Sequence, residues 1–316
     1  MSTIETPQRD ELVIDVRTKE PTPGSAIRVQ RRSSGGLTRG VGGAVLWTFT
    51  AIAALSLWFL FHALILTSLQ EHGAQVRLRA QFREQVAAAT APVGPRIKQG
   101  SPVARLDLGL PGLHNVIVVE GTSSSVLIRG PGHLAATPLP GQSGVSVIFG
   151  RSATYGAPFR SITNLSSGHT IRVTTGQGAF TYRIDRIRRA GDPILSLTAG
   201  ASRLTLVTSE ANGWRSGWAP DHAVYVDASL QTGAAQPAPA GIPTAVTKRS
   251  QAMEGDPSAL AILVFWLQGL LLASVLVSWA WTRWLHGQTW IVGLPIVFAV
   301  LWGVSGAVLR LLPNLI

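Results

Sequence analysis

Three residues of this sequence could do chemistry together at one site: Arg151, Ser209 and His222. A serine hydroxyl becomes a nucleophile only where a general base accepts its proton, and His222 is able to do so near neutral pH. Arg151 cannot be that base, because a guanidinium stays protonated with a pKa above about 12. It could instead stabilise an oxyanion. If the fold brought the three together, they would make a hydrolytic or acyl-transfer site.

Several other kinds of site are excluded by composition or spacing. The sequence contains no cysteine, so it can form neither a disulfide nor a thiolate metal site, and it has no thiol nucleophile. Asp185 and Asp192 have no paired carboxylate at a spacing that suggests acid–base work. Single histidines, without the HxH or HExxH spacing of zinc sites, are His114, His133, His169 and His222. We therefore expect no metal and no cofactor.

The composition is typical of a membrane protein. Charged residues make up 14% of the chain and hydrophobic residues 46%, whereas soluble proteins contain about 25% charged residues. The formal net charge of +11 could indicate nucleic-acid binding or an anionic membrane surface. Residues 1–40 are basic but lack the interleaved aromatic residues that stack on bases, so we interpret them as a disordered cytoplasmic tail. We expect no nucleic-acid partner.

Three segments are apolar enough to cross a bilayer, which takes about 20 helical residues. The predicted transmembrane helices are residues 44–69, 258–282 and 287–309. Basic residues before the first span place the N-terminus in the cytoplasm, so the domain after it and the C-terminus would lie outside. His62 lies within the first span, and we expect it near the exit interface or against a neighbouring helix.

The chain between the first two spans has three parts. Residues 70–100 carry apolar side chains at helical spacing, which predicts a helical stalk or linker. Residues 101–230 alternate short runs of Val, Ile, Leu and Thr with Gly, Pro, Ser and Asn, which predicts an all-β barrel or sandwich. Residues 231–257 are rich in Pro, Ala and Gly and predict a linker.

The β-rich region resembles the sortase family, most closely its actinobacterial class E. The resemblance covers about residues 101–230, where four segments follow in the family's order: PVARLDLGLPGLHNVIVVEG, VLIRGPGHLAATPLPGQSGVSVIFG, ATYGAPFRSITNLSSGHTIRV and RLTLVTS. Sortases are transpeptidases of Gram-positive cell surfaces. The resemblance implies an extracellular sortase-like barrel, carrying a groove for a sorting peptide, attached here to three transmembrane helices.

The resemblance also indicates which positions would be catalytic. Sortases use a Cys nucleophile, a His that protonates the leaving amine and an Arg that stabilises the oxyanion. Ser209 stands at the Cys position, Arg151 at the His position, and either His222 or Ala223 at the Arg position. All three catalytic positions are therefore replaced. His133, where this class commonly has a histidine, is interpreted as structural.

Replacement of a whole catalytic set predicts loss of catalysis, because its members act together. The leading hypothesis is a catalytically inactive sortase-like subunit that scaffolds a cell-surface membrane assembly. One alternative is a pseudo-sortase that binds sorting-signal peptides or assists an active sortase. Another is a Ser-dependent transpeptidase that uses Ser209 and His222. The groove, with Arg151, Tyr155, Ser209 and His222 as candidate binding residues, could bind a peptide or be filled by the protein's own linker or by a partner.

The last two predicted spans add more than an anchor needs. Small residues in the last span (Gly303, Ser305, Gly306 and Ala307) could let a neighbouring helix approach closely, or could be ordinary residues of a span. We therefore expect other membrane or cell-surface proteins as partners, with self-association through these two helices as a further candidate. The expected location is the plasma membrane of a Gram-positive bacterium.

Overall fold

Alternation of side chains explains why the middle of the chain forms strands. In segments such as SRLTLVTSE, successive side chains point to opposite faces, so one face can fill an interior. The computed structural model describes residues 35–110, 113–189, 191–194, 196–210, 222–232, 236–243, 245–283 and 286–316. Its strands are β1 (Pro102–Asp107), β2 (Val116–Glu120), β3 (Gly132–His133), β4 (Gly144–Phe149), β5 (Thr170–Thr175), β6 (Gly178–Arg189), β7 (Ser202–Glu210) and β8 (His222–Thr232).

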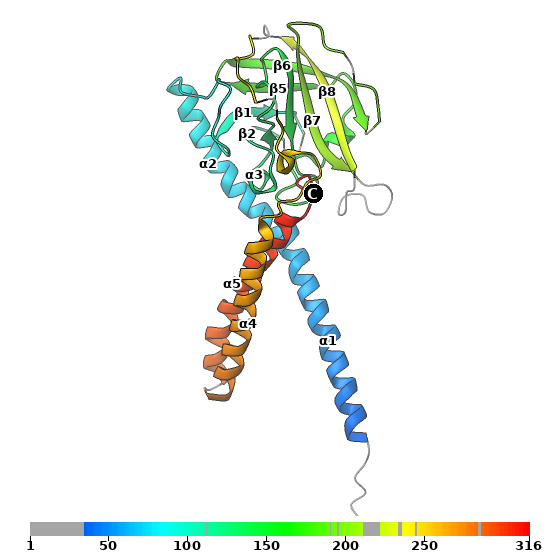
Figure 1. Ribbon diagram of the computed structural model, residues 1–316, viewed down its shortest axis with the longest axis vertical. Coiled ribbons are helices and arrows are strands. Elements are labelled where there is room, and N and C mark those ends of the chain that lie inside the picture. Colours follow the sequence, from blue (N-terminus) through cyan, green and yellow to red (C-terminus); the bar gives the residue numbers. More distant parts are fainter. Residues whose placement is uncertain are drawn as a thin grey trace, which may run out of the picture. The chain divides into compact units, whose positions relative to one another are not determined.

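These strands close into a barrel (Figure 1). Their order around it is β1-β2-β3-β4-β7-β8-β6-β5. The pairs β2–β3 and β4–β7 are parallel, while β7–β8 and β6–β8 are antiparallel. Fully buried aliphatic side chains from different strands fill the interior, including Leu106, Ile148, Ile171, Leu206 and Val226. The predicted β-barrel is confirmed.

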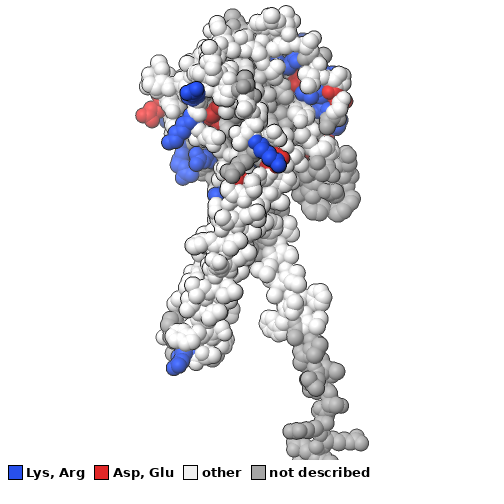
Figure 2. Space-filling model, in the orientation of Figure 1, with Lys and Arg blue, Asp and Glu red and all other residues white. Residues whose placement is uncertain are grey.

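The helices are α1 (Gly35–Phe61), a π-helical turn (His62–Leu66), α2 (Thr67–Ala87), α3 (Ser124–Leu127), α4 (Ala259–Arg283) and α5 (His286–Leu311), with short 3-10 turns at Ile162–Asn164 and Lys248–Ser250. Three helical stretches are long and apolar enough to cross a membrane: Val45–Ala87, Ala259–Arg283 and Gln288–Leu311. Figure 2 shows charged side chains on the barrel and almost none over the paired helices α4 and α5. The prediction of three apolar helices is confirmed.

The chain divides into two compact units, Met1–Ile52 and Ala53–Ile316. The described part of the first unit is helical residues 35–52 of α1. Residues 35–40, which were expected to belong to the tail, therefore begin α1. The rest of the predicted tail, residues 1–34, lies outside the described residues.

Helix α2 occupies the segment that was expected to be a stalk, and it packs along the barrel. Leu78 and Phe82 lie in one buried cluster with Ile117 of β2. The buried Gln75 donates to the carbonyl oxygens of Ile117 (3.0 Å) and Arg129 (2.8 Å), and its own amide oxygen accepts from the N–H of Ile117 (2.8 Å). This helix is therefore docked on the barrel.

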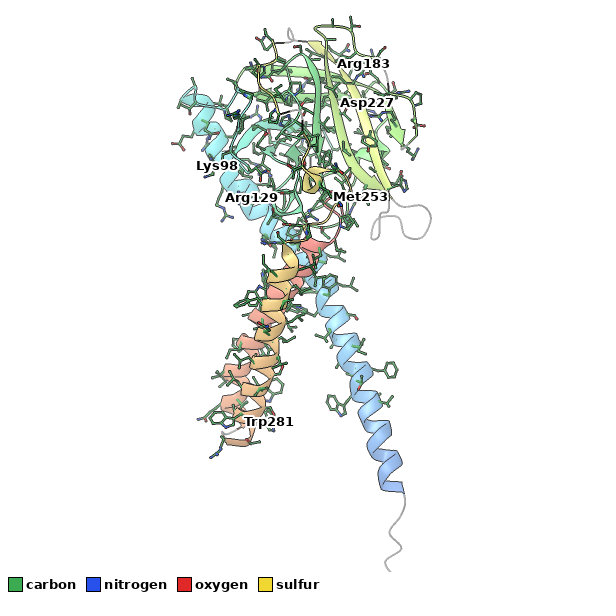
Figure 3. The ribbon with its side chains drawn as sticks, in the orientation of Figure 1. Lys98, Arg129, Arg183, Asp227, Met253 and Trp281 are labelled. Carbon is green, nitrogen blue, oxygen red and sulfur yellow. The ribbon has the colours of Figure 1, made fainter. Side chains whose placement is uncertain are left out.

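Helices α4 and α5 form an antiparallel hairpin, and the end of α4 and the start of α5 carry the edge-to-face pair Trp281–Trp290; Figure 3 labels Trp281. A Cβ atom placed on Gly303 would lie 2.3 Å from the ring of Trp266, so the glycine permits close packing of α5 on α4. Gly306, by contrast, has no neighbour within 4 Å of such an atom. Gly303 is thus needed for the packing of α5 on α4, whereas no residue of the described chain packs against the Gly306 position.

His62 and Trp58 both face helix α5. The Trp58 indole N–H donates to Ser305 Oγ at 3.1 Å, and the His62 ring meets the Trp302 ring edge-on with centroids 5.1 Å apart. His62 is 2% exposed. Of the two environments expected for His62, the structure shows a neighbouring helix of the same chain.

Candidate functional site: a barrel groove filled by the chain itself

Residues 312–316 follow α5 directly and lie against the barrel beside β7 and α3, where Figure 1 marks the C-terminal end. Leu315 is fully buried in a cluster with Leu127, Phe149, Val207 and Ala223, and the surface that these four side chains form with Ser209 is called the groove. The chain's own linker was one of the occupants expected for the groove, whereas residues 312–316 were not singled out.

Ser209 lies near the end of β7 and points into this groove. Its side chain donates to the main-chain oxygen of Leu315 at 2.7 Å and lies 2.8 Å from the hydroxyl oxygen of Ser152. The Leu315 oxygen also accepts from the Ser152 N–H at 2.9 Å. The carbonyl of Leu315 therefore sits among converging donors, and Ser209 is one of them.

The register of β7 against β8 decides which residue accompanies Ser209. Ser209 pairs with Ala223, and Glu210 pairs with His222. Because side chains alternate along a strand, His222 points to the opposite face of the sheet from Ser209. The His222 ring lies 3.8 Å from the Glu210 carboxylate. The structure thus brings Ser209 and Ala223 together and directs His222 toward Glu210.

Arg151 follows β4 and is 1% exposed. Its guanidinium donates to the main-chain oxygen of Ser124 (3.1 Å), to Ser124 Oγ (2.9 Å), to Thr154 Oγ1 (3.2 Å) and to the main-chain oxygen of Ile316 (2.7 Å). Burial lowers the pKa of Arg151 to about 10, so the group is still protonated at neutral pH. It acts as a donor that holds Ile316, and it cannot serve as a base.

Tyr155 supports Arg151 from one side. Its ring centroid lies 4.9 Å from the guanidinium carbon, which is cation–π geometry. Its backbone adopts the left-handed conformation with φ of 50°, and its N–H donates to Thr67 Oγ1 of α2 at 3.0 Å. Burial raises the pKa of Tyr155 above its ordinary value. Tyr155 therefore packs against the Arg151 guanidinium and links the loop after β4 to helix α2.

Asn314 fastens the segment at its other end. Its side-chain amide donates to the main-chain oxygens of Thr122 and Gln251, both at 2.8 Å, and its N–H donates to the oxygen of Glu254 at 2.9 Å. Gln251 and Glu254 belong to the predicted linker 231–257. This part of the linker therefore lies on the barrel and forms one edge of the groove; Figure 3 labels its neighbour Met253.

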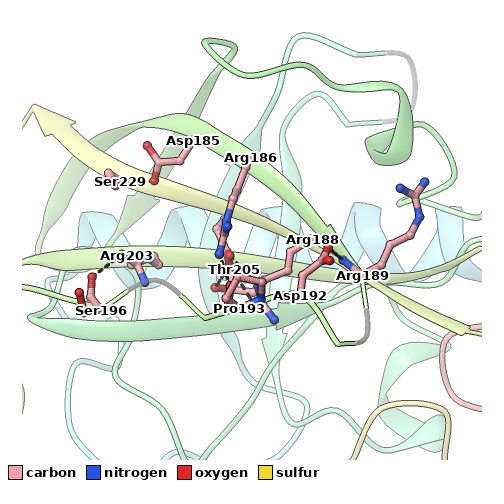
Figure 4. A network of polar contacts seen from close by, with 11 residues as sticks. Asp185, Arg186, Arg188, Arg189, Asp192, Pro193, Ser196, Arg203, Thr205 and Ser229 are labelled. Carbon is pink, nitrogen blue, oxygen red and sulfur yellow. Dashed lines mark hydrogen bonds and ion pairs between the residues drawn. The ribbon is translucent and has the colours of Figure 1, made fainter.

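The face of the sheet beside the groove carries a polar network on β6, β7 and β8 (Figure 4). The Arg188 guanidinium bonds the Asp227 carboxylate at 2.9 Å and lies over the Tyr225 ring at 4.6 Å. Thr205 donates to the same carboxylate at 2.8 Å. Arg186 donates to the oxygen of Pro193. These contacts tie the arginines of β6 to the sheet and its adjoining loop.

His133 lies away from the groove, in the barrel wall. Its Nδ1 is 2.9 Å from the Glu120 carboxylate and its Nε2 is 3.0 Å from the main-chain oxygen of Pro138. Both side chains of the ion pair are almost fully buried. Such a buried bridge has the geometry of a structural contact. Within the described part of the chain, no three His, Asp or Glu side chains are grouped to hold a metal ion.

Comparison with known proteins identifies the barrel. Residues 108–229 match the family model described as the sortase domain. No curated protein matches the sequence. Apart from residues 102–107, the four segments that carried the resemblance in the sequence lie within the matched region.

Solved structures give similar matches. Sortase E from Streptomyces avermitilis is 32% identical, with 43% of this chain and 91% of that chain covered and a TM-score of 0.35. A Clostridium perfringens sortase D5 transpeptidase is 24% identical, covering 51% of this chain and 99% of that chain, with a TM-score of 0.42. Sortase A from Corynebacterium diphtheriae is 18% identical, covering 52% and 92%, with a TM-score of 0.37.

Proposed function

The chain belongs to the sortase family through its β-barrel, and from this premise we propose that it is a catalytically inactive member that scaffolds a membrane assembly at the cell surface. One observation carries the proposal: the Ser209 hydroxyl donates to Leu315, a residue of the chain's own C-terminal segment. A nucleophilic hydroxyl needs a base to take its proton and space for a substrate carbonyl. Next to the Ser209 hydroxyl, the Leu315 carbonyl oxygen and the Ser152 hydroxyl occupy the places that a base and a substrate carbonyl would need.

The other two replaced positions support the same conclusion. Arg151 stands where the family has its histidine, and it stays protonated, so it cannot exchange a proton with a leaving amine. Ala223 faces Ser209 and has no polar group to stabilise an oxyanion. A set in which all members are replaced retains little catalysis, because such groups act as a unit.

The membrane helices support a role in assembly. One span would hold the barrel, yet α4 and α5 add a hairpin. At Gly306 no atom of the described chain lies within 4 Å of an added Cβ atom, so a helix of another protein has room to approach there. We propose the plasma membrane of a Gram-positive bacterium as the location. The N-terminus would be cytoplasmic, with the barrel and residues 312–316 together on the outer side.

The test is the mass of the full chain extracted in mild detergent from its native membrane, with identification of co-purifying proteins. The proposal predicts a complex larger than the monomer, with a reproducible membrane or surface protein as partner. The matched comparison is the Ser209→Ala variant, which should form the same complex. A monomer without partners in both preparations would contradict the scaffold function.

A second candidate is a peptide-binding pseudo-sortase that receives sorting-signal peptides or assists an active sortase. The observation in its favour is that the groove already holds a short segment of chain through main-chain and side-chain contacts. Binding of sorting-type peptides to the protein supports this candidate, and it fails if none binds even after residues 312–316 are removed.

The third candidate, a transpeptidase using Ser209 and His222, has less geometric support. It needs the histidine within hydrogen-bond reach of the hydroxyl, whereas the register turns the two side chains to opposite faces. This candidate predicts an activity that disappears in Ser209→Ala. Activity that is absent from the parent chain, or unaffected by the substitution, removes it.

A further inference from the structure

The contacts of residues 314–316 are those of a bound peptide. Two successive main-chain oxygens are held, that of Leu315 by Ser209 and Ser152 and that of Ile316 by Arg151. Thr154 Oγ1 also donates to the Ile316 oxygen, at 2.6 Å. Residues 314 and 315 lie in a turn that the Ile316 N–H closes on the Pro313 oxygen at 3.1 Å, so the groove holds a turn through its main-chain oxygens.

Two side chains of the segment meet specific surroundings. The Leu315 side chain is fully buried among aliphatic and aromatic residues. The Asn314 amide donates to two main-chain oxygens, so an aliphatic side chain at that position would leave both acceptors without this donor. The groove thus supplies two main-chain acceptors for an N–H donor at position 314 and an apolar enclosure for the side chain at 315.

A short tether connects this segment to the membrane hairpin. Helix α5 ends at Leu311, and the first side chain fastened in the groove is Asn314. The Asp256 N–H donates to the Arg310 oxygen at 3.0 Å, which pins the start of the hairpin to its end. A short tether gives a segment an effective concentration of roughly millimolar, against which a free peptide must compete.

We propose that the groove is a binding site for a peptide turn with an amide side chain followed by an apolar side chain. Residues 312–316 are its resident ligand, and another peptide enters only after they leave. The inference rests on the peptide-binding function proposed above and adds its ligand class and its regulation. Because the resident segment follows α5, a partner that displaces this helix opens the groove.

The absence of cysteine from the chain allows a direct test. A Ser209→Cys variant of the full chain, in mild detergent, is reacted with a maleimide, and an exposed Ser167→Cys variant serves as the control. Modification of a covered thiol follows the population of the open state. We expect Cys at 209 to react at least about tenfold more slowly than Cys at 167, and removal of residues 312–316 to abolish most of that difference.

A second variant covers the case in which the truncated chain does not fold. Asn314→Ala in the Ser209→Cys background removes two hydrogen bonds of the segment. Because one hydrogen bond contributes about 1 kcal/mol net, we expect the labelling rate to rise at least several-fold. A synthetic peptide LLPNLI should slow labelling of the opened variant, and LLPALI should protect much less.

The outcomes separate this inference from the proposed function. Equal labelling with and without residues 312–316, or no protection by LLPNLI at millimolar concentration, overturns the resident-ligand inference. Neither result bears on the absence of catalysis or on the complex in the membrane. If LLPALI protects as well as LLPNLI, the assigned ligand class is wrong.

Discussion

The hydroxyl of Ser209 donates a 2.7 Å hydrogen bond to the carbonyl oxygen of Leu315. The two residues are 106 positions apart in the sequence. Ser209 lies near the end of β7, at the position that the sequence resemblance predicts for the sortase nucleophile, and Leu315 belongs to the segment that follows α5. The Ser209 hydroxyl therefore holds another part of the same chain.

Restoring the nucleophile alone should not restore catalysis. In Ser209→Cys, a thiol would face Ala223, with Arg151 in place of a proton-donating histidine. The leaving amine would then lack a proton donor, so we expect no transpeptidation of a sorting-type peptide to an amine acceptor, measured by chromatography. Product formed by this single variant, and not by the parent chain, would show that the remaining residues suffice for the reaction.

Arg151→Ala should destabilise the domain strongly. The substitution leaves the oxygens of Ser124 and Ile316 without their guanidinium donor and empties a fully buried volume. A buried acceptor left without its donor costs about 1–3 kcal/mol of unfolding free energy, and here two such acceptors are left. Thermal unfolding of the full chain measures it, with the exposed Arg77→Ala as the control. A melting temperature equal to that of the control would show that the Arg151 contacts add nothing.

Gln75→Ala should loosen helix α2 from the barrel. Three hydrogen bonds between its amide and main-chain groups would be lost, at about 1–3 kcal/mol for the unsatisfied groups. We expect faster hydrogen exchange at the Ile117 amide, measured by mass spectrometry. Gln81→Ala, on the exposed side of the same helix, should leave this exchange unchanged. Similar exchange in both variants would contradict the docking role.

His133→Ala should cost more stability than His114→Ala. His133 and Glu120 are both almost fully buried, so removing the imidazole leaves the Glu120 side chain without its hydrogen-bond partner, at about 1–3 kcal/mol. The His114–Asp107 pair is exposed, and such pairs contribute about 0–1 kcal/mol. Denaturant unfolding of the two variants gives the comparison. Equal midpoints would show that the buried bridge does not stabilise the barrel.

Gly303→Ala and Gly306→Ala should differ although both lie on helix α5. A methyl group at 303 would lie 2.3 Å from the Trp266 ring, whereas at 306 no atom lies within 4 Å. We expect the first substitution to change the tryptophan fluorescence and lower the thermal stability of the hairpin, while the second preserves both. If the second disrupts the membrane complex without changing hairpin stability, the Gly306 face is the contact with a partner. Equal effects on stability would contradict the assigned packing.

Much of the fold was predictable because it depends on local patterns. The alternation in β4 and β7, the charge-free spans and the TLVTS segment each lie within a short window of sequence. The resemblance also predicts that Ser209 and Arg151 occupy catalytic positions of the family, which stays a prediction, and it leaves His222 and Ala223 as alternatives for the third position. Only the strand register could decide which of these two faces Ser209, and it pairs Ser209 with Ala223.

The filling of the groove was not predictable in the same way. Residues 312–316 are too few to show a period, and their partners Arg151, Ser152 and Thr122 are far away in the sequence. Gln75 gave no signal either, because a glutamine on a predicted helix is ordinarily exposed. In both cases the information lies in long-range packing, which a single sequence does not display.

The most direct test of the absence of catalysis is the intact mass of the full chain after incubation with a sorting-type peptide. A serine transpeptidase would retain the acyl half of the peptide on Ser209 when no acceptor amine is present. We predict an unchanged mass for the parent chain, both with and without residues 312–316. A mass increase equal to the acyl fragment, present in the parent chain and absent from Ser209→Ala, would contradict the account.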